Sequence, residues 1–208
     1  MIEHGYGRLD KLLVDFKDQD AFSSDNRSSQ DKKLNVLLAP SWGPNAILER
    51  LDDIIIDKLL KNNFSVTLRP HPQTLKNNPK LINSIVLKYS NNQSFFYDKN
   101  ISATKSLKNA DVMISDWSGV AYEYSFARLK PILFIDVPLK VNNPNYESYN
   151  IEPIEIKLRN EVGIVLSEEN LGQLHEKINL LISNKDIWKG KIKKVRKQTI
   201  FNIESSGK

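Results

Sequence analysis

The sequence contains no cysteine. A chain without thiols forms neither a disulfide framework nor a thiolate metal site, which agrees with a reducing compartment. Long hydrophobic runs are missing as well, because no segment approaches the roughly 20 apolar residues that span a bilayer. The N-terminus also lacks the unbroken apolar core of a signal peptide. We therefore expect a cytoplasmic protein.

Positive charge is in excess in one short segment only. The 208 residues carry a formal net charge of +5, and seven basic residues lie between Lys185 and Lys197 against one acid, Asp186. A basic segment attracts anionic lipid as readily as nucleic acid, but no stacking ladder or recognised nucleic-acid motif accompanies this one. We expect no nucleic-acid partner. Residues 185–197 are either a contact with an anionic membrane surface or a solvated helix end that covers the domain.

The chain divides into three segments by composition. Residues 1–17 are a short fragment, and residues 18–33 are polar, serine-rich and without periodicity, which is typical of a flexible loop. From residue 34 apolar strands alternate with helical patterns. Strands are predicted at 35–40, 65–70, 94–98, 112–115, 131–137 and 163–166. Helices are predicted at 47–63, near 79–89, at 102–110, after Ser118 and over about 168–183. This alternation predicts one α/β domain over 34–208, a Rossmann-like parallel sheet with helices on both faces.

Polar residues follow three of these strands, in the sequences APSWGPN, RPHPQ and SDWSG. In an open parallel sheet, ligands bind outside the carboxyl ends of the strands. In SDWSG, the amides at the start of the following helix form an anion site, so Ser115, Ser118 and Gly119 are candidate phosphate contacts. We assign Asp116 a structural role because its charge would repel a phosphate. The alternative is that Asp116 and Ser118 only cap the helix.

The RPHPQ sequence presents a fixed cation, Arg69, and a histidine, His71, that lies between two prolines. Arginine offers a forked donor, and proline restrains φ on both sides of the histidine. A proline-rich turn with a locally bonded histidine is the alternative. Together with SDWSG at a neighbouring strand end, these groups match a pyrophosphate.

Two further residues complete the candidate set. Glu123 lies four residues after Gly119. Its side chain either faces solvent on the helix or accepts hydrogen bonds from the hydroxyls of a ribose. Ser41, in the loop after the first strand, is a further candidate for substrate binding. No cluster of acids or histidines suits a metal, and we expect no cofactor.

At RPHP and SDWSGVAYE together, the chain resembles the CDP-glycerol glycerophosphotransferase family, the teichoic-acid and capsule polymerases, which adopt the two-domain GT-B fold. APSWG is similar to that family's A-P-T-W-R loop, and GYGRLDKL (5–12) is similar to the G-x-P-R-x-D-x-L segment that joins its two halves. The resemblance runs from about Gly5 to the C-terminus. It departs at Gly43, where the family has arginine, at Gly119, where it has serine, and at Gly7, where it has proline.

The resemblance implies that the chain is the C-terminal, nucleotide-binding half of a transferase. The implied reaction moves glycerol phosphate from CDP-glycerol, or a related nucleotide donor, to an acceptor hydroxyl and releases CMP. Arg69 and His71 would be catalytic and engage the phosphates, Ser115 and Ser118 would bind the pyrophosphate, and Glu123 would bind the ribose. The polymer acceptor would be held by a missing N-terminal domain, so the enzyme is expected to be incomplete as this chain alone.

Several alternatives stay open. The chain is either such a transferase half or a non-catalytic nucleotide-binding remnant, and the donor is CDP-glycerol, CDP-ribitol or a nucleotide sugar used by another GT-B glycosyltransferase. Because the family's polymer substrates are anchored in membranes, the resemblance also implies a peripheral position on the inner face of the membrane.

Overall fold

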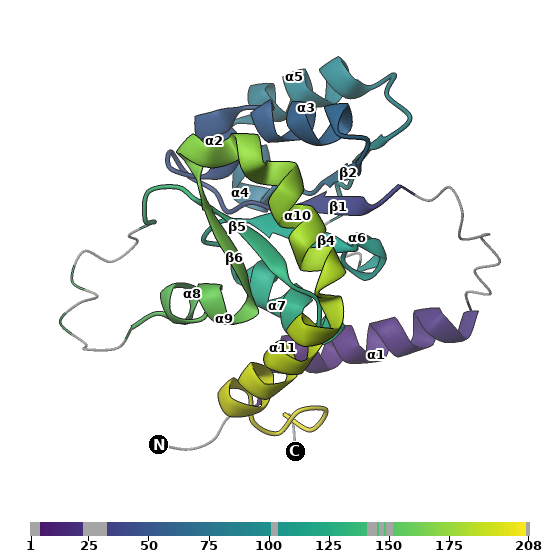
Figure 1. Ribbon diagram of the computed structural model, residues 1–208, viewed down its shortest axis with the longest axis vertical. Coiled ribbons are helices and arrows are strands. Elements are labelled where there is room, and N and C mark those ends of the chain that lie inside the picture. Colours follow the sequence, from purple (N-terminus) through teal and green to yellow (C-terminus); the bar gives the residue numbers. More distant parts are fainter. Residues whose placement is uncertain are drawn as a thin grey trace.

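A computed structural model of the chain describes residues 5–22, 33–100, 104–140, 145, 148 and 152–206. Its centre is a six-stranded sheet in the order β3-β2-β1-β4-β5-β6, in which all neighbouring strands are parallel (Figure 1). The strands are β1 (Asn35–Leu38), β2 (Ser65–Leu68), β3 (Phe95–Tyr97), β4 (Val112–Ser115), β5 (Ile132–Asp136) and β6 (Gly163–Ser167). The predicted Rossmann-like α/β fold is confirmed.

Helices cover both faces of the sheet. One face packs against α2 (Ile47–Leu51), α3 (Ile54–Lys61), α4 (Pro72–Asn77), α5 (Pro79–Tyr89), η2 (Glu168–Gln173) and α10 (Leu174–Ser183). The other packs against α1 (Gly7–Phe22), α6 (Lys105–Asn109), α7 (Gly119–Arg128), α8 (Ile154–Lys157), α9 (Arg159–Val162) and α11 (Lys185–Thr199). In Figure 1, α3 and α5 lie above the sheet, and α1, α7 and α11 lie below it.

The alternation of side chains along each strand explains the two layers. Val36 and Leu38 of β1 belong to the core on the α3 side, whereas Leu37 between them belongs to the core on the α7 side. All three are fully buried. Each such side chain contributes about 1.5–3 kcal/mol through the removal of apolar surface from water. Because both faces are covered, the central strands are continuously apolar.

The helices of the α/β unit differ from the prediction at several points. The single helix expected over 47–63 is two helices, because Asp52 has φ 49° and ψ −121°, which lies outside the helical region and ends α2. The helix expected from residue 168 begins as a 3₁₀ segment, η2, before α10. The short helices α4, α8 and α9 have no counterpart in the predicted pattern.

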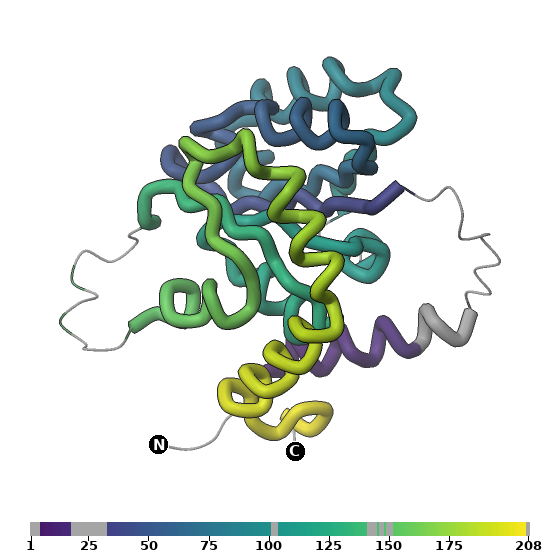
Figure 2. Tube along the Cα trace, viewed as in Figure 1, coloured from purple at the N-terminus to yellow at the C-terminus, as the bar shows by residue number. Residues whose placement is uncertain are grey.

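The N-terminal segment packs onto the α/β unit. α1 buries Leu9, Leu12 and Phe16 in the core on the α7 side, and it extends to Phe22, into the segment expected to be a loop. Residues 23–32 of that expected loop lie outside the described part of the chain. Figure 2 shows the start of α1, in purple, beside the yellow C-terminal segment. There the backbone NH groups of Glu204 and Ser206 donate to the Asp10 carboxylate at 2.6 and 2.9 Å.

Candidate functional site

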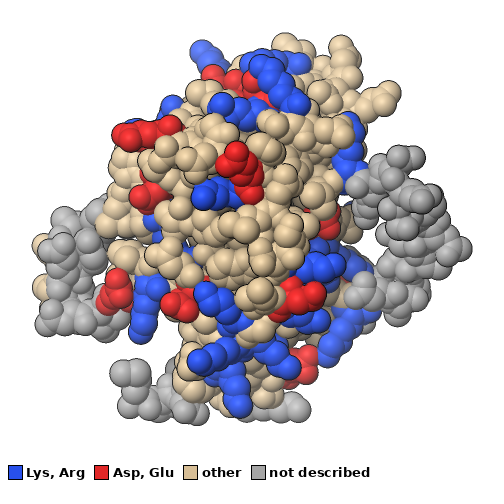
Figure 3. Space-filling view, in the orientation of Figure 1, with Lys and Arg blue, Asp and Glu red and all other residues tan. Residues whose placement is uncertain are grey.

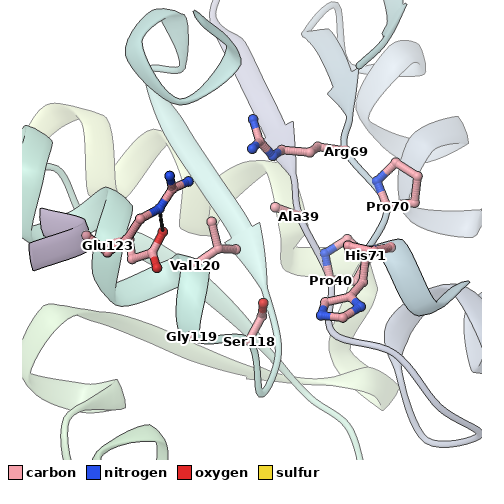
Figure 4. Close-up of a pocket in the computed structure, with 11 residues that line it drawn as sticks. Ala39, Pro40, Arg69, Pro70, His71, Ser118, Gly119, Val120 and Glu123 are labelled. Carbon is pink, nitrogen blue, oxygen red and sulfur yellow. Dashed lines mark hydrogen bonds and ion pairs between the residues drawn. The ribbon is translucent and has the colours of Figure 1, made fainter. Parts of the chain in front are cut away.

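A pocket of about 340 Å³ lies at the carboxyl ends of β1, β2 and β4. The strand order reverses here, since β1 is followed in sequence by β2 on one side and lies beside β4 on the other. This is the point at which doubly wound sheets bind ligands. The two strand ends that carry RPHP and SDWSG were expected to be neighbours, but β1 lies between them. The lining residues are Arg8, Ala39, Pro40, Arg69, Pro70, His71, Pro72, Ser118, Gly119, Val120 and Glu123 (Figure 4).

Arg69 forms one wall of the pocket, at the end of β2. Its backbone NH donates to Leu38 O at 2.9 Å, so it continues the parallel ladder. The side chain is 5% exposed, and its Nη1 donates to Ser106 Oγ at 2.7 Å and to Asp98 Oδ2 at 3.2 Å. Burial lowers the pKa of the guanidinium, and the Asp98 carboxylate opposes this shift. Arginine remains charged under such a shift, so the wall carries a fixed cation.

His71 extends the same wall. It is the N-cap of α4, where its Nδ1 accepts a hydrogen bond from Gln73 N at 3.1 Å and Pro72 occupies the first helical position. Burial lowers the pKa of His71, and the positive charge of Lys140 lowers it further. The ring is therefore neutral at pH 7. Because Nδ1 is an acceptor, the proton is assigned to Nε2, which is left as a hydrogen-bond donor.

The opposite wall begins with α7. Ser118 occupies the N-cap position, but its side chain makes no capping hydrogen bond, and both Ser118 and Gly119 line the pocket. A Cβ atom added at Gly119 would meet nothing within 4 Å, so the glycine leaves the start of the helix open. The amides of the first turn of this 10-residue helix favour an anion.

Ser115 and Ser41 lie outside the pocket lining. The Ser115 side chain is fully buried and donates to Ala39 O at 2.7 Å, across to the residue after β1. Ser41 is also buried, and its backbone NH donates to Asp116 Oδ1 at 2.6 Å. Both residues fix the loops behind the pocket, so their assignment to substrate binding stays a prediction without a place in the lining.

Asp116 joins the β1–α2 loop to the start of α7. In addition to Ser41 N, its carboxylate accepts from Ile47 N at 3.0 Å. Burial raises the pKa of Asp116, and the hydrogen bonds from the backbone of Ser41 and Ile47 oppose the shift. The side chain thus has the structural role predicted for it.

Glu123 completes the second wall, but it already has partners. Tyr6 Oη donates to Glu123 Oε1 at 2.8 Å, and Arg8 Nε donates to Oε2 at 3.3 Å, the dashed line in Figure 4. Burial and the bond to Glu123 raise the pKa of Tyr6 to about 12. Tyr6 and Arg8 are not among the site residues predicted from the sequence. Their position in the GYGRLDKL segment, which resembles the family's segment between its two halves, is the signal that points to them.

The loop after β1 contributes the rim near His71. The Trp42 ring centroid is 6.0 Å from that of His71, and Lys140 Nζ lies 3.8 Å from the Trp42 centroid. Gly43 has φ 108°, a conformation that L side chains rarely adopt. An arginine at position 43, as in the resembled family, would therefore strain this backbone.

The described residues contain no group of three or more histidines and acids that could hold a metal ion. In that part of the chain, no helix is both long and apolar enough to cross a membrane.

Comparison with protein families matches residues 1–141 to CDP-glycerol:poly(glycerophosphate) glycerophosphotransferase. The match covers more than half of the 208 residues. The chain belongs to this family. It is therefore a member of a transferase family, in agreement with the resemblance seen at RPHP and SDWSG.

Solved structures share the fold of this family member. The wall teichoic acid polymerase TagF matches with a TM-score of 0.55 and 20% identity, over 99% of this chain and 49% of its own. UDP-GlcNAc 2-epimerase from Neisseria meningitidis, bound to UDP-GlcNAc, matches with a TM-score of 0.55 and 16% identity, over 98% of this chain and 50% of its own. The chain thus has the Rossmann-like unit of GT-B proteins and spans about half the length of these chains. Comparison with curated proteins gives no significant match.

Proposed function

We propose that the chain is the donor-binding half of a CDP-glycerol glycerophosphotransferase-like enzyme of teichoic-acid or capsular polymer synthesis. Family membership supports the reaction class, and the pocket supports the ligand class. A TagF variant has been soaked with CDPG, which agrees with a cytidine nucleotide as the donor. The acceptor and its polymer would be held by a second half of the enzyme.

The carrying observation is the placement of phosphate-binding groups on both walls of one pocket. Arg69 supplies a charged, forked donor and His71 supplies Nε2–H on the first wall, while the start of α7 supplies amides on the second. A pyrophosphate presents acceptor oxygens in both directions, so it can be bonded from both walls at once.

In the proposed reaction, an acceptor hydroxyl attacks the β-phosphorus of CDP-glycerol. The new bond joins the acceptor oxygen to this phosphorus, and the bond from the phosphorus to the bridging oxygen breaks with its electron pair on CMP. Arg69 and the His71 Nε2–H stabilise the charge that develops on the CMP phosphate. The acceptor's proton passes to a base in the acceptor-binding half. Such a transfer depends on positioning and charge stabilisation more than on covalent catalysis.

Calorimetric titration of the full chain with CDP, CDP-glycerol, CMP and UDP tests the proposal. CDP and CDP-glycerol should bind, and CMP should bind more weakly because it lacks the β-phosphate that reaches the second wall. UDP that binds as tightly as CDP would favour the nucleotide-sugar alternative. A chain that binds none of the four would contradict a nucleotide site.

We also propose that α11 contacts an anionic membrane surface. Ile192 and Val195 are buried against the core on the α7 side, so one stripe of the helix packs inward, as the helix-end interpretation predicted. Ile187 is 65% exposed and lies one residue before Trp188. In Figure 3 basic residues gather at the lower end of the molecule, where α11 lies. Its exposed lysines are Lys185, Lys189, Lys191, Lys193, Lys194 and Lys197.

Co-sedimentation with vesicles that contain anionic lipid, at low and high salt, tests this surface. Each lysine near such a surface contributes on the order of 1 kcal/mol. Replacing four of them, Lys189, Lys191, Lys193 and Lys194, with glutamine should release the chain. A control variant carries the same four-charge loss at exposed lysines elsewhere, namely Lys61, Lys76, Lys80 and Lys99. If vesicle binding does not depend on salt, or if both variants lose it equally, α11 is a solvated helix and not a membrane contact.

A further inference from the structure

The pocket contains a second arginine that the proposed function does not use. Arg8, from the first turn of α1, lines the same cavity as Arg69, although the two residues come from opposite walls. Besides burial, the positive charge of Arg8 is one of the causes that lower the pKa of Arg69. Both residues line one pocket, so their like charges oppose each other there. An anion between them converts this repulsion into two attractions.

Arg8 is held in an orientation that leaves donors available. Within the described part of the chain its one side-chain partner is Glu123, and this bond uses Nε at 3.3 Å. Both terminal Nη groups are therefore left for another acceptor. Glu123 accepts one bond at each carboxylate oxygen, and each oxygen has a further lone pair. The carboxylate can hold Arg8 and Tyr6 and still accept a hydrogen bond from a ribose hydroxyl.

The backbone that carries Arg8 is fixed from two sides. Leu9 and Leu12, which follow it on α1, are fully buried in the core. Asp10 accepts hydrogen bonds from the backbone of residues 204 and 206 and from the Ser206 hydroxyl. A Cβ atom at Gly5 would lie 2.0 Å from Ser206 Cβ, so the C-terminal segment passes directly over the start of this segment. Arg8 thus reaches the pocket from a folded position.

We propose that Arg8 is a second phosphate-binding residue, which closes on the pyrophosphate of the donor from the wall opposite Arg69 while Glu123 orients it through Nε. This inference rests on the proposed function for the identity of the donor. It assigns the first turn of α1 to the donor site itself. Arginine suits the position because its fork can bond the carboxylate through one nitrogen and phosphate oxygens through the others.

Calorimetry of the full chain with inorganic pyrophosphate and with CDP tests the proposal. Hydrogen bonds to charged groups predict that Arg8→Ala weakens both ligands about tenfold to a hundredfold. Arg8→Lys keeps the charge but removes the fork, so it should also bind more weakly than wild type. If the thermal midpoints of both Arg8 variants equal that of wild type, the loss of affinity is not caused by unfolding.

Two control variants separate phosphate binding from a structural role. Tyr6→Phe removes the other hydrogen bond between this segment and Glu123 without removing a cation, so pyrophosphate affinity should be unchanged. Lys11→Ala removes one positive charge from the same helix, where Lys11 pairs with Asp15 on the surface, and should have no effect either. A loss of affinity in either control equal to that of Arg8→Ala would overturn the proposal.

The outcomes distinguish this inference from the proposed function. If CDP binds to wild type and to Arg8→Ala equally, the inference is wrong and the nucleotide site stands. If pyrophosphate binds through Arg8 but CDP binds no better than other nucleoside diphosphates, the inference stands and the cytidine donor is wrong. If wild type binds neither pyrophosphate nor CDP, both are wrong.

Discussion

The two walls of the pocket are fixed in different ways. The wall at β2 is built within the α/β unit, because Arg69 is held by Asp98 and Ser106, which lie 29 and 37 residues away. The wall at α7 depends on the start of the described chain, because Glu123 is held by Tyr6 and Arg8, which lie 117 and 115 residues away. One wall follows from local folding, and the other requires α1 to dock.

The difference extends to exposure. The side chain of Arg69 is 5% exposed in its ion pair with Asp98, whereas that of Arg8 is 36% exposed in its pair with Glu123. A solvent-exposed ion pair contributes about 0–1 kcal/mol to stability, whereas the loss of one partner from a buried pair is strongly destabilising. The β2 wall is therefore preorganised, and the α7 wall is the side where a ligand can change contacts at little cost.

The largest expected effect is on stability, at the Asp116 carboxylate that joins the β1–α2 loop to the start of α7. Asp116→Ala leaves the backbone NH groups of Ser41 and Ile47 without their acceptor, and each buried unsatisfied donor costs about 1–3 kcal/mol. We expect the free energy of unfolding, measured with urea, to fall by about 2–5 kcal/mol. Asp57→Ala, which removes an exposed partner of Lys61, is the control and should change it little. A loss at Asp116 no larger than the control's would show that these hydrogen bonds do not hold the loop.

The next effect is at the preorganised wall. Arg69→Ala should weaken CDP binding by about one to two orders of magnitude, since hydrogen bonds to charged groups contribute about 1.5–3 kcal/mol. It should also lower the thermal midpoint, because Asp98 loses its cation. Asp98→Asn is the matched variant, because it disturbs the same pair but leaves the cation in the pocket. If the two variants bind CDP equally well, Arg69 does not contact the ligand.

The strand-end residues were predictable because their signals are local. Arg69, His71, Ser118 and Gly119 each lie within four residues after the end of an apolar strand, and parallel strands bring their carboxyl ends to one edge. Glu123 could be placed as well, since it lies on the helix that starts at Gly119. All five line the pocket.

The remaining features depend on tertiary contacts that a local pattern does not contain. Ser115 ends its strand, but its hydroxyl bonds to the backbone after β1 and not to the pocket. The helix breaks between α2 and α3 at Asp52, although the helical spacing of apolar residues continues through this position in the sequence. Arg8 reaches the site only because α1 packs beneath α7, a contact between residues more than a hundred positions apart.

A smaller effect is expected at His71. Its pKa should lie below the usual value of about 6.5, and an anion bound beside it should raise the pKa. Because the unfolded state binds more protons in the window below 6.5, stability should fall as the pH falls through that window. NMR titration of the histidine ring protons, assigned with His71→Gln, measures the pKa of His71 without pyrophosphate and its rise when pyrophosphate is present. A titration midpoint that pyrophosphate leaves unchanged would remove His71 from the phosphate site.

The smallest effect separates Ser118, which lines the pocket, from Ser115, which lies at the end of β4 outside the lining. Ser118→Ala should weaken CDP binding only about fivefold, because one neutral hydrogen bond contributes about 1 kcal/mol and the helix amides still bind the phosphate. Ser115→Ala removes a buried bond to Ala39 O, so it should lower the thermal midpoint and leave CDP affinity unchanged. The pair is tested by calorimetry and thermal unfolding on the same samples. A larger loss of affinity in Ser115→Ala than in Ser118→Ala would mean that the first serine, and not the second, faces the donor.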